Sequence, residues 1–505
     1  MIKLIYRIES DYMSKKRMLI VTSVTLSVVT ISLGIVKLYQ TYALSNYIGT
    51  VTDTGIDVYI NDDSYASIPA NGSSNVYYML TNTNPGTVKY GVAYQTTSGV
   101  TVKVYDTSED PATGTIEEND KKYIKLHLEN KNSTNKTIEL STVLGYENGG
   151  DLVVPSGVTL VTDTYTPPPT AAEYITKLYT TASKTTVTNN SITYNTAPSV
   201  SLMNDRLGGT TTDLDGGNIR YYGASPNNYI YFNCSDYSNQ TSSTCETWRI
   251  IGVFDGKLKL IRGSQIGTYS WDNKDTSTGA ESNFGKNDWT TARLMKLLNP
   301  SDYYTTDSND NNLGQGLYYN SASGKCYSGQ NNATVDCNFT STGIKNDITR
   351  NMIAETTYNL GGWNRNTVYP NLMYEKERGT TVYTGRPTTP WTGKIALAYT
   401  SDYGYAADLN QCKDKTLYDY NNSTCTSNNW MKAIITNNGS NSGWLLTPYC
   451  STSSNVWYVY PVGNVYFNYT VYSAFGAVPV LSLSSELGIE SGGDGSSSNP
   501  YKLSA

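Results

Sequence analysis

The run TWRIIGVFDGKLKLI, at residues 247–261, carries the clearest fold signal in this sequence. Its two halves are rich in branched and aromatic residues, and Asp255-Gly256 between them is typical of a tight hairpin turn. A third run of this kind, YIYF, lies just upstream at 229–232. The region therefore predicts an antiparallel sheet, and we place the beginning of its domain near Asn218.

Two helices are expected after this hairpin. Asn287 and Asp288 can cap a helix that continues to Leu298, where Pro300 follows and ends it. A second helix is expected over 344–359, because apolar residues recur there along one helical stripe. With short strands and long polar loops on either side, these helices predict an α+β domain.

Upstream, residues 48–164 are expected to be all-β. Strand-length segments are separated by Asn-Pro-Gly, Ser-Gly, Asn-Asp and Asn-Gly-Gly turn signals. In YIKLHL, at 123–128, apolar and polar residues alternate, as in a half-buried strand, and His127 falls on the outward face. Regular strands at this spacing predict a β-sandwich, which we interpret as a stalk.

The domain boundaries follow from composition. Residues 165–217 are expected to be a linker, because three prolines form a stiff break and only 171–182 has a helical face. The α+β domain is then expected over 218–485. Residues 486–505 are Gly/Ser-rich and are expected to trail off as a tail.

The N-terminus carries the targeting information. Residues 18–36 contain no charge and are long enough for a helix to cross a bilayer. The basic residues just before them are expected to keep 1–17 in the cytoplasm. The sequence thus predicts a single-pass protein of the cell membrane with its C-terminal ectodomain outside. A cleaved signal peptide, with small residues at Ala43 and Ser45, is the alternative.

The cysteines agree with export. The chain has seven, none of them spaced as in a zinc site, and six occur as near pairs that would each close a short polar loop. We expect each pair to form a disulfide in an oxidising compartment, although spacing does not determine connectivity. Cys450 is left over. The expected pairs are Cys234 with Cys245, Cys326 with Cys337, and Cys412 with Cys425.

Residues 433–485 contain no Asp, Glu, Lys, Arg or His, although 16% of the whole chain is charged. Polar residues interrupt every apolar run, so this tract is not a membrane span. Its Tyr, Asn, Ser and Gly are the residues that antibody paratopes favour, and we interpret it as a recognition surface. A polar β-hairpin edge is the plain alternative. The candidate ligand-binding residues are Tyr449, Asn455, Tyr458, Tyr460, Asn464, Tyr466, Asn468, Tyr469 and Tyr472.

The order strand, helix, helix, long loops and late hairpin resembles the C-type-lectin-like fold. That fold pairs its first and last strands and binds ligand through its late loops. The resemblance implies that 248–253 and 477–483 are the closing strands. Strand alternation in the final hairpin predicts separately that Trp457, Val459, Val465 and Phe467 face inward, while alternate residues such as Tyr458 face out.

The end of the chain also resembles an uncharacterised domain common in Gram-positive bacterial surface proteins, whose pattern runs roughly WWLRSP, YV, GxV and VRPAL. The matching stretches are GWLLTP at 443–448 and VPVL at 478–481, with WYV and GNV between them. Leu446 and Val478 stand where the pattern has arginines, so any polar role of those arginines is lost here. The resemblance implies a membrane-anchored surface protein and names no activity.

Some bacterial and phage lectin-fold proteins are diversified by retroelements that randomise adenines in Asn codons. Such changes yield residues that include Asn, Tyr, Ser, Thr, Cys, Gly, Ala, Val and Phe, but never Lys, Glu, Gln, Met or Trp. Between Tyr449 and Ala477 those five types are absent, apart from Trp457. A surface loop that is merely rich in Asn and Tyr is the alternative interpretation.

Other functional classes find less support. A net charge of −6 without a basic cluster beyond the N-terminus argues against nucleic acid as a partner. His127 is the single histidine of the chain and is expected on the outward face of a strand. Neither a Ser-His-Asp nor a Cys-His catalytic set is therefore expected. We expect no enzyme activity, no cofactor and no metal. The loop carboxylates that could bind calcium do not have the spacing of an EF-hand. They are Asp213, Asp215, Asp307 and Asp310.

The sequence therefore predicts a cell-surface adhesin or receptor that recognises an extracellular glycan or protein. An extracellular hydrolase active on carbohydrate or cell wall is the rival class, and a structural envelope protein is the third. A hydrolase would need a pair of carboxylates, and nothing in the sequence singles out two of the candidates. These are Asp255, Asp272, Glu281 and Asp288.

Overall fold

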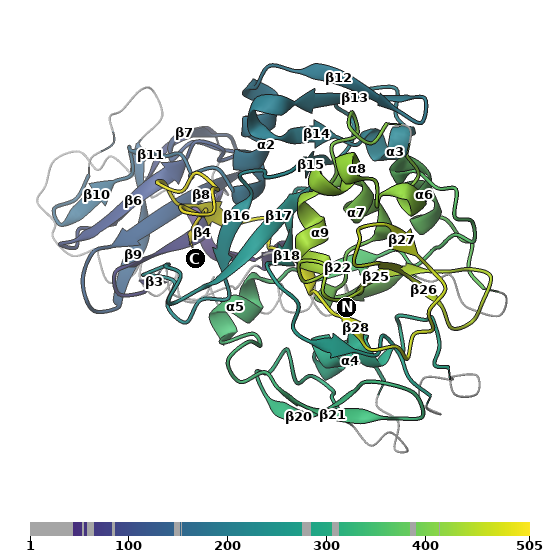
Figure 1. The fold of residues 1–505 in the computed structure, drawn as a ribbon. Helices are drawn as coiled ribbons and strands as arrows, with labels where there is room; N and C mark the ends of the chain where they lie inside the picture. The colour runs from purple at the N-terminus through teal and green to yellow at the C-terminus, as the bar shows by residue number, and fades with distance from the viewer. Residues whose placement is uncertain are drawn as a thin grey trace, which may run out of the picture. The chain divides into compact units, whose positions relative to one another are not determined.

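The computed structural model describes residues 44–52, 55–57, 65–82, 86–145, 152, 154–274, 284–305, 313–383, 390–413 and 415–504. These residues form a mostly β structure with several antiparallel sheets and a few short helices (Figure 1). The chain divides into two compact units, Met1–Thr166 and Pro167–Ala505. The anchor expected at 18–36 lies outside the described residues, and no described helix is long and apolar enough to cross a membrane.

The described residues of the first unit form two sheets. One has the strand order β11-β6-β8-β4-β1-β2 and the other β10-β5-β9-β3, with β7 paired to β5. The first sheet consists of β1 (Leu44–Thr52), β2 (Gly55–Asp57), β4 (Gly72–Asn82), β6 (Val100–Tyr105), β8 (Lys121–Asn130) and β11 (Thr164–Tyr165). The second consists of β3 (Tyr65–Ile68), β5 (Val88–Gln95), β7 (Thr113–Ile116), β9 (Lys136–Gly145) and β10 (Val158–Leu160).

Both sheets of this unit send alternate side chains into one core. Tyr78 and Leu80 of β4 and Leu126 of β8 are buried there together with Tyr90 and Val92 of β5. Two sheets that share a core in this way are packed face to face, as in a β-sandwich.

His127 lies on the opposite face of β8 from that core, but it is not exposed. Its ring stacks on Tyr165 with 3.6 Å between centroids, and only 6% of the residue is accessible. Its Nδ1 lies 2.7 Å from Oδ1 of Asn75. Burial lowers the pKa of His127, against the nearby Glu129. Strand alternation predicted the face correctly, but it could not show that Tyr165 covers it.

The second unit is built on a nine-stranded sheet in the order β12-β13-β14-β15-β17-β18-β29-β24, with β16 also paired to β17. Asp255 and Gly256, both with positive φ, turn β17 into β18 as the hairpin signal predicted. The strands are β12 (Thr185–Asn189), β13 (Ile192–Ala197), β14 (Leu202–Asn204), β15 (Ile219–Tyr221), β16 (Tyr229–Phe232), β17 (Glu246–Phe254), β18 (Lys257–Arg262), β24 (Ile395–Ala396) and β29 (Val480–Ser482).

Two expectations about this sheet were wrong. The segment 165–217, expected to be a linker, supplies three of its strands, because Asn190 and Ser191 adopt positive φ and close a hairpin between β12 and β13. The strands assigned to lectin-type closure, now β17 and β29, do not pair, since β18 lies between them and bonds to both. Neither local composition nor strand period indicates which strand becomes a neighbour of which.

A second sheet carries the uncharged tract. Its order is β19-β28-β25-β26-β27. The strands are β19 (Thr268–Tyr269), β25 (Gly443–Pro448), β26 (Val456–Val459), β27 (Val465–Tyr466) and β28 (Phe475–Gly476). Three small ladders complete the β structure of this unit: β20 (Ser323–Tyr327) with β21 (Thr334–Asn338), β22 (Thr356–Tyr358) with β23 (Trp391–Gly393), and β30 (Gly488–Ile489) with β31 (Leu503–Ser504).

The helices of this unit are short and more numerous than the three expected, at 171–182, from Asn287 and over 344–359. They are α2 (Ala171–Thr181), α3 (Arg206–Gly209), α4 (Arg293–Leu298), α5 (Asp347–Met352), α6 (Pro370–Glu377), α7 (Thr400–Tyr405), α8 (Ser423–Ser427) and α9 (Trp430–Ile435). The helix expected from Asn287 begins only at Arg293, and Asp288 instead accepts hydrogen bonds from Thr290. The helix expected over 344–359 ends at Met352, because the chain then joins β22.

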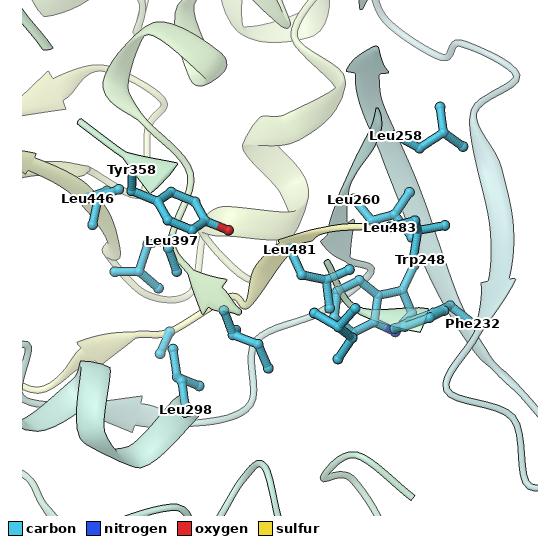
Figure 2. Packing of buried hydrophobic residues seen from close by; sticks show 14 of the residues in the cluster. Phe232, Trp248, Leu258, Leu260, Leu298, Tyr358, Leu397, Leu446, Leu481 and Leu483 are labelled. Atoms are coloured by element: carbon cyan, nitrogen blue, oxygen red, sulfur yellow. The ribbon is translucent and has the colours of Figure 1, made fainter. Parts of the chain in front are cut away.

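A large apolar core holds this unit together. Figure 2 shows Trp248 and Phe232 beside Leu260 and Leu483. The indole of Trp248 is fully buried and meets the Phe232 ring edge-on at 5.2 Å. Burial of so large a side chain is worth about 3–5 kcal/mol relative to alanine.

The C-terminal segment does not trail off as expected. Tyr501 and Leu503 are buried in the same core. Tyr501 exchanges backbone hydrogen bonds with the strand that contains Tyr229 and Tyr231. The amide of Gln240 bonds to both the N–H and the carbonyl of Leu503. Gly and Ser in the tail thus form turns that bring two apolar side chains back to the core.

Candidate functional site

The sheet that carries the uncharged tract has buried residues on each of its faces. Along β26, Trp457 and Val459 enter one core cluster, and Tyr458 enters the other together with Trp444 of β25. The alternation was therefore predicted correctly. The exposure of Tyr458 was not, because Trp444 and Phe475 cover its ring and leave 1% of the residue accessible.

Five rings gather at the open edge of this sheet above Tyr458. Tyr466 contacts Tyr460 at 5.6 Å and Tyr418 at 4.8 Å, and Tyr469 contacts Phe475 at 5.3 Å. Tyr460 is 40% and Tyr469 47% exposed, which is high for rings in a cluster. We call this set the aromatic face; it consists of Tyr418, Tyr460, Tyr466, Tyr469, Phe475 and the exposed Asn468.

Tyr458 forms the floor of the aromatic face. Its ring lies 5.6 Å from Tyr469, 5.0 Å from Phe475 and 6.3 Å from Tyr466. Its hydroxyl donates a hydrogen bond to Oδ1 of Asn468. Burial raises the pKa of this hydroxyl well above its usual value, so it stays neutral. The bond orients the Asn468 amide, so that its amino group can donate to a ligand.

Tyr449 and Asn455 do not belong to this face. The ring of Tyr449 stacks on Phe467 at 4.2 Å, and its hydroxyl donates to the carbonyl of Asn364. Asn455 donates to the carbonyl of Phe467 and so fastens the hairpin. Phe467 packs against the same cluster as Trp457, on the opposite side of the sheet from Tyr466. The two-residue strand period therefore separates these residues from the aromatic face.

Two further candidates lie apart from the aromatic face. Asn464 is 1% exposed, in the turn between β26 and β27. Tyr472 is half-buried beside Phe284, at 6.0 Å. Of the nine predicted residues, the structure thus brings together Tyr458, Tyr460, Tyr466, Tyr469 and Asn468.

Two members of the aromatic face, Phe475 and Tyr418, were not predicted from the sequence. Phe475 was already within the uncharged tract, and its ring was visible in the sequence. Tyr418 comes from far outside the tract, in the loop that the Cys412–Cys425 disulfide closes. A ring inside a short disulfide loop is a signal of a positioned side chain, but its partner on β27 could not be read from the sequence.

The three expected disulfides are present, and they indicate an extracellular domain. They join Cys234 to Cys245, Cys326 to Cys337, and Cys412 to Cys425.

The surroundings of these cysteines differ from the short polar loops that the spacing predicted. All six are buried, at 7% exposure or less. Cys245 directly precedes β17, and its disulfide with Cys234 belongs to the large core of the unit. Cys326 and Cys337 lie on the paired strands β20 and β21, so that their disulfide crosses a ladder. Loop composition could not show this, because burial depends on the segments that fold over each pair.

Cys450 is the remaining cysteine; it is free and buried. Its thiol lies 3.3 Å from the carbonyl of Thr381. Burial raises the pKa of this thiol to about 12, so it is protonated and unreactive at neutral pH.

Among the carboxylates considered for hydrolysis, Asp272 and Asp288 are engaged by neighbouring groups. Asp272 is buried and accepts backbone hydrogen bonds from Lys286 and Arg293. Asp288 accepts from Thr290 and pairs with Lys286 at 3.3 Å. Asp255 lies in the β17–β18 turn, and Glu281 lies outside the described residues.

The two possible calcium ligands that the structure describes are also engaged by neighbouring groups. The Asp215 carboxylate accepts hydrogen bonds from Tyr179 and Asn195, and Asp213 caps the backbone N–H of Asp215. Asp307 and Asp310 lie outside the described residues. Over the described ranges, no three His, Cys, Asp or Glu side chains lie where they could jointly hold a metal ion.

No protein-family model and no curated protein matches this chain.

Proposed function

We propose that the protein is a cell-surface receptor or adhesin whose aromatic face binds a neutral glycan. One observation carries the proposal: the half-exposed rings of Tyr460, Tyr466 and Tyr469 lie together with the Asn468 amide, in a tract without charge. Apolar faces of sugar rings pack on aromatic rings, and sugar hydroxyls need neutral hydrogen-bond partners. Tyr hydroxyls and an Asn amide supply such partners without the cost of desolvating a charge.

We further propose that the protein is located at the cell surface. The disulfides support an oxidising environment for the second unit. In this proposal, residues 18–36 anchor the protein in the membrane and the sandwich of the first unit acts as a stalk. The proposal rests on the aromatic face and not on a lectin-type closure, because β18 separates the strands expected to close such a fold.

The test is binding of the purified protein to an array of neutral glycans, with Tyr460→Ala and Tyr469→Ala variants. Each change is expected to weaken binding about fivefold, since one ring contact contributes about 1 kcal/mol. Tyr65→Ala is the matched control, because Tyr65 is 44% exposed in the first unit. Undiminished binding in the double variant would remove the aromatic face as the site.

Two other results would point to different classes. Capture of a protein, with no glycan bound, would retain the aromatic face but change its ligand. Cleavage of the arrayed sugars would favour the hydrolase class instead.

A further inference from the structure

A separate cavity opens beside the nine-stranded sheet. Its volume is about 510 Å³, within the range of sites that hold small molecules. One wall comes from β16, β17 and the end of β18, through Tyr229, Arg249 and Arg262. The other comes from the C-terminal end of α9 and the turn after it, through Ala433, Asn437 and Asn438. None of these residues belongs to the aromatic face.

Arg249 is the central feature of this cavity. It is 6% exposed, and its guanidinium lies 3.7 Å from the centroid of the Tyr229 ring and 4.9 Å from that of Trp430. Its Nε donates to Oδ1 of Asn228 at 2.5 Å, and its Nη2 to the carbonyl of Pro226 at 3.3 Å. The guanidinium is therefore held in one orientation by two rings and two neutral acceptors.

Within the part of the chain that the structure describes, Arg249 forms no ion pair, and its Nη1 has no hydrogen-bond partner. Burial lowers the pKa of Arg249 to about 10, so the group remains charged at neutral pH. Burying a cation without a counter-ion makes folding less favourable, and an anionic ligand bound beside the cation would offset this free-energy cost.

The other charges of the cavity cancel each other. Nε of Arg262 lies 3.0 Å from Oε2 of Glu246, and its Nη2 donates to Oε1 of the same carboxylate at 3.2 Å. Glu246 also accepts from the indole N–H of Trp248, so its oxygens are engaged. Two cations and one anion leave a single positive charge, and it belongs to Arg249.

The opposite wall offers neutral donors and acceptors. Asn437 and Asn438 are polar residues with positive φ, which turns the chain at the rim of the cavity. Both line the cavity next to the apolar Ala433 and Ile434. An anionic ligand would form a strong charge-assisted hydrogen bond with Arg249, and the side-chain amides of Asn437 and Asn438 would orient the ligand through further hydrogen bonds.

We propose that this cavity, the Arg249 pocket, binds an organic carboxylate of about the size of a monosaccharide or a dipeptide. The carboxylate takes the free Nη1 of Arg249, and the rest of the ligand lies between the Tyr229 ring and the amides of Asn437 and Asn438. A sugar acid and the C-terminus of a peptide share this chemistry.

The experiment titrates the purified full-length protein with four probes by calorimetry. These are glucuronate and glucose, and N-acetyl-alanyl-alanine and its C-terminal amide. At least one carboxylate is expected to bind about tenfold or more tightly than its neutral counterpart, as hydrogen bonds to charged groups allow. The responding pair identifies the source as sugar or peptide, and a response from both supports the proposal equally.

Variants locate the site. Arg249→Gln is expected to reduce carboxylate binding tenfold or more, and Arg249→Lys to reduce it less, because lysine keeps the charge but lacks the planar fork. Arg365→Gln is the matched control, since it removes one positive charge from an exposed arginine elsewhere in the unit. If Arg249→Gln does not fold, the rim pair Asn437→Ala and Asn438→Ala decides instead, with an expected loss of about threefold or more.

The proposal is overturned by any of three results. These are no carboxylate binding at about 10 mM, well above a millimolar Kd; equal binding of the neutral probes; and unchanged binding by the folded variants. Glycan binding at the aromatic face is measured with neutral sugars and different variants. The proposals for the two sites can therefore be refuted independently of each other.

Discussion

At the scale of single residues, the buried charges of the second unit separate into two kinds. Asp402 lies 2.8 Å from Arg220 and 2.5 Å from Lys259, and Asp205 lies 2.5 Å from Arg220. This network is neutral overall and joins β15 and β18 to α7, so we interpret it as structural. Arg249 is buried to a similar degree but has no such partner among the described residues, which is why we assign it a ligand.

The network leads to a prediction about acid stability. Burial alone would raise the pKa of Asp402, but Lys259 and Arg220 outweigh it and hold the pKa at about 2. A carboxyl whose pKa is lower in the folded state stabilises the protein above its unfolded pKa, near 4. That contribution, about 2 kcal/mol, is lost as the pH falls from about 4 towards 2.

The measurement is urea unfolding of the parent protein and of Asp402→Asn between pH 7 and pH 2. At pH 7 the variant is expected to be less stable by about 3–5 kcal/mol, because the buried Lys259 loses its partner and Arg220 keeps only Asp205. The difference between the two proteins should narrow as the pH falls. A difference that stays constant over this range would contradict the assignment.

At the scale of elements, the contact between α9 and β25 underlies both proposed sites. Gly443 begins β25, and a Cβ there would lie 2.1 Å from the carbonyl oxygen of Ile435, at the end of α9. The missing side chain lets the helix end rest directly on the strand. That strand supports β26 and the aromatic face, while α9 forms a wall of the Arg249 pocket.

Gly443→Ala is therefore expected to push α9 away from β25. The added methyl group meets backbone that cannot rotate aside, and overpacking of this kind costs about 1–3 kcal/mol. Gly324→Ala is the control, because its Cβ meets only the flexible end of the Leu317 side chain at 2.9 Å. Thermal unfolding compares the two variants, and equal stability would show that the close approach is unimportant.

At the scale of the whole molecule, each of the two units has its own core. The first unit buries residues of both its sheets in one cluster, and the second unit has separate clusters that contain no residue before Ala171. All three disulfides lie in the second unit. Each closes a loop short enough that its contribution is at most about 3 kcal/mol.

The second unit is thus expected to fold without the first. A fragment of residues 167–505, made in an oxidising compartment, should unfold cooperatively and bind glycan as the full-length protein does. The same fragment ending at residue 498 should be much less stable, because it lacks the buried Tyr501 and Leu503. If the shorter fragment is equally stable, the tail is not part of the core.

Local patterns were enough for several features of this chain. Short stretches of sequence predicted the Asp255-Gly256 turn, the alternation along β8 and β26 and the three cysteine pairs. The turn and the alternation depend on backbone preferences, so neighbouring residues are sufficient to specify them. The cysteine pairs were expected from their short loops, but the fold decides the connectivity, which spacing does not determine.

Contacts between distant segments were beyond such patterns. The period of β26 showed which face Tyr458 occupies, but not that Trp444 and Phe475 would cover it. In the same way, Arg249 can be recognised in the sequence as an arginine inside an apolar strand. That it is buried without an ionic partner among the described residues depends on every segment that folds around it. A strand's period selects a side of the sheet; what then lies on that side is settled by packing, where burial outweighs local preference.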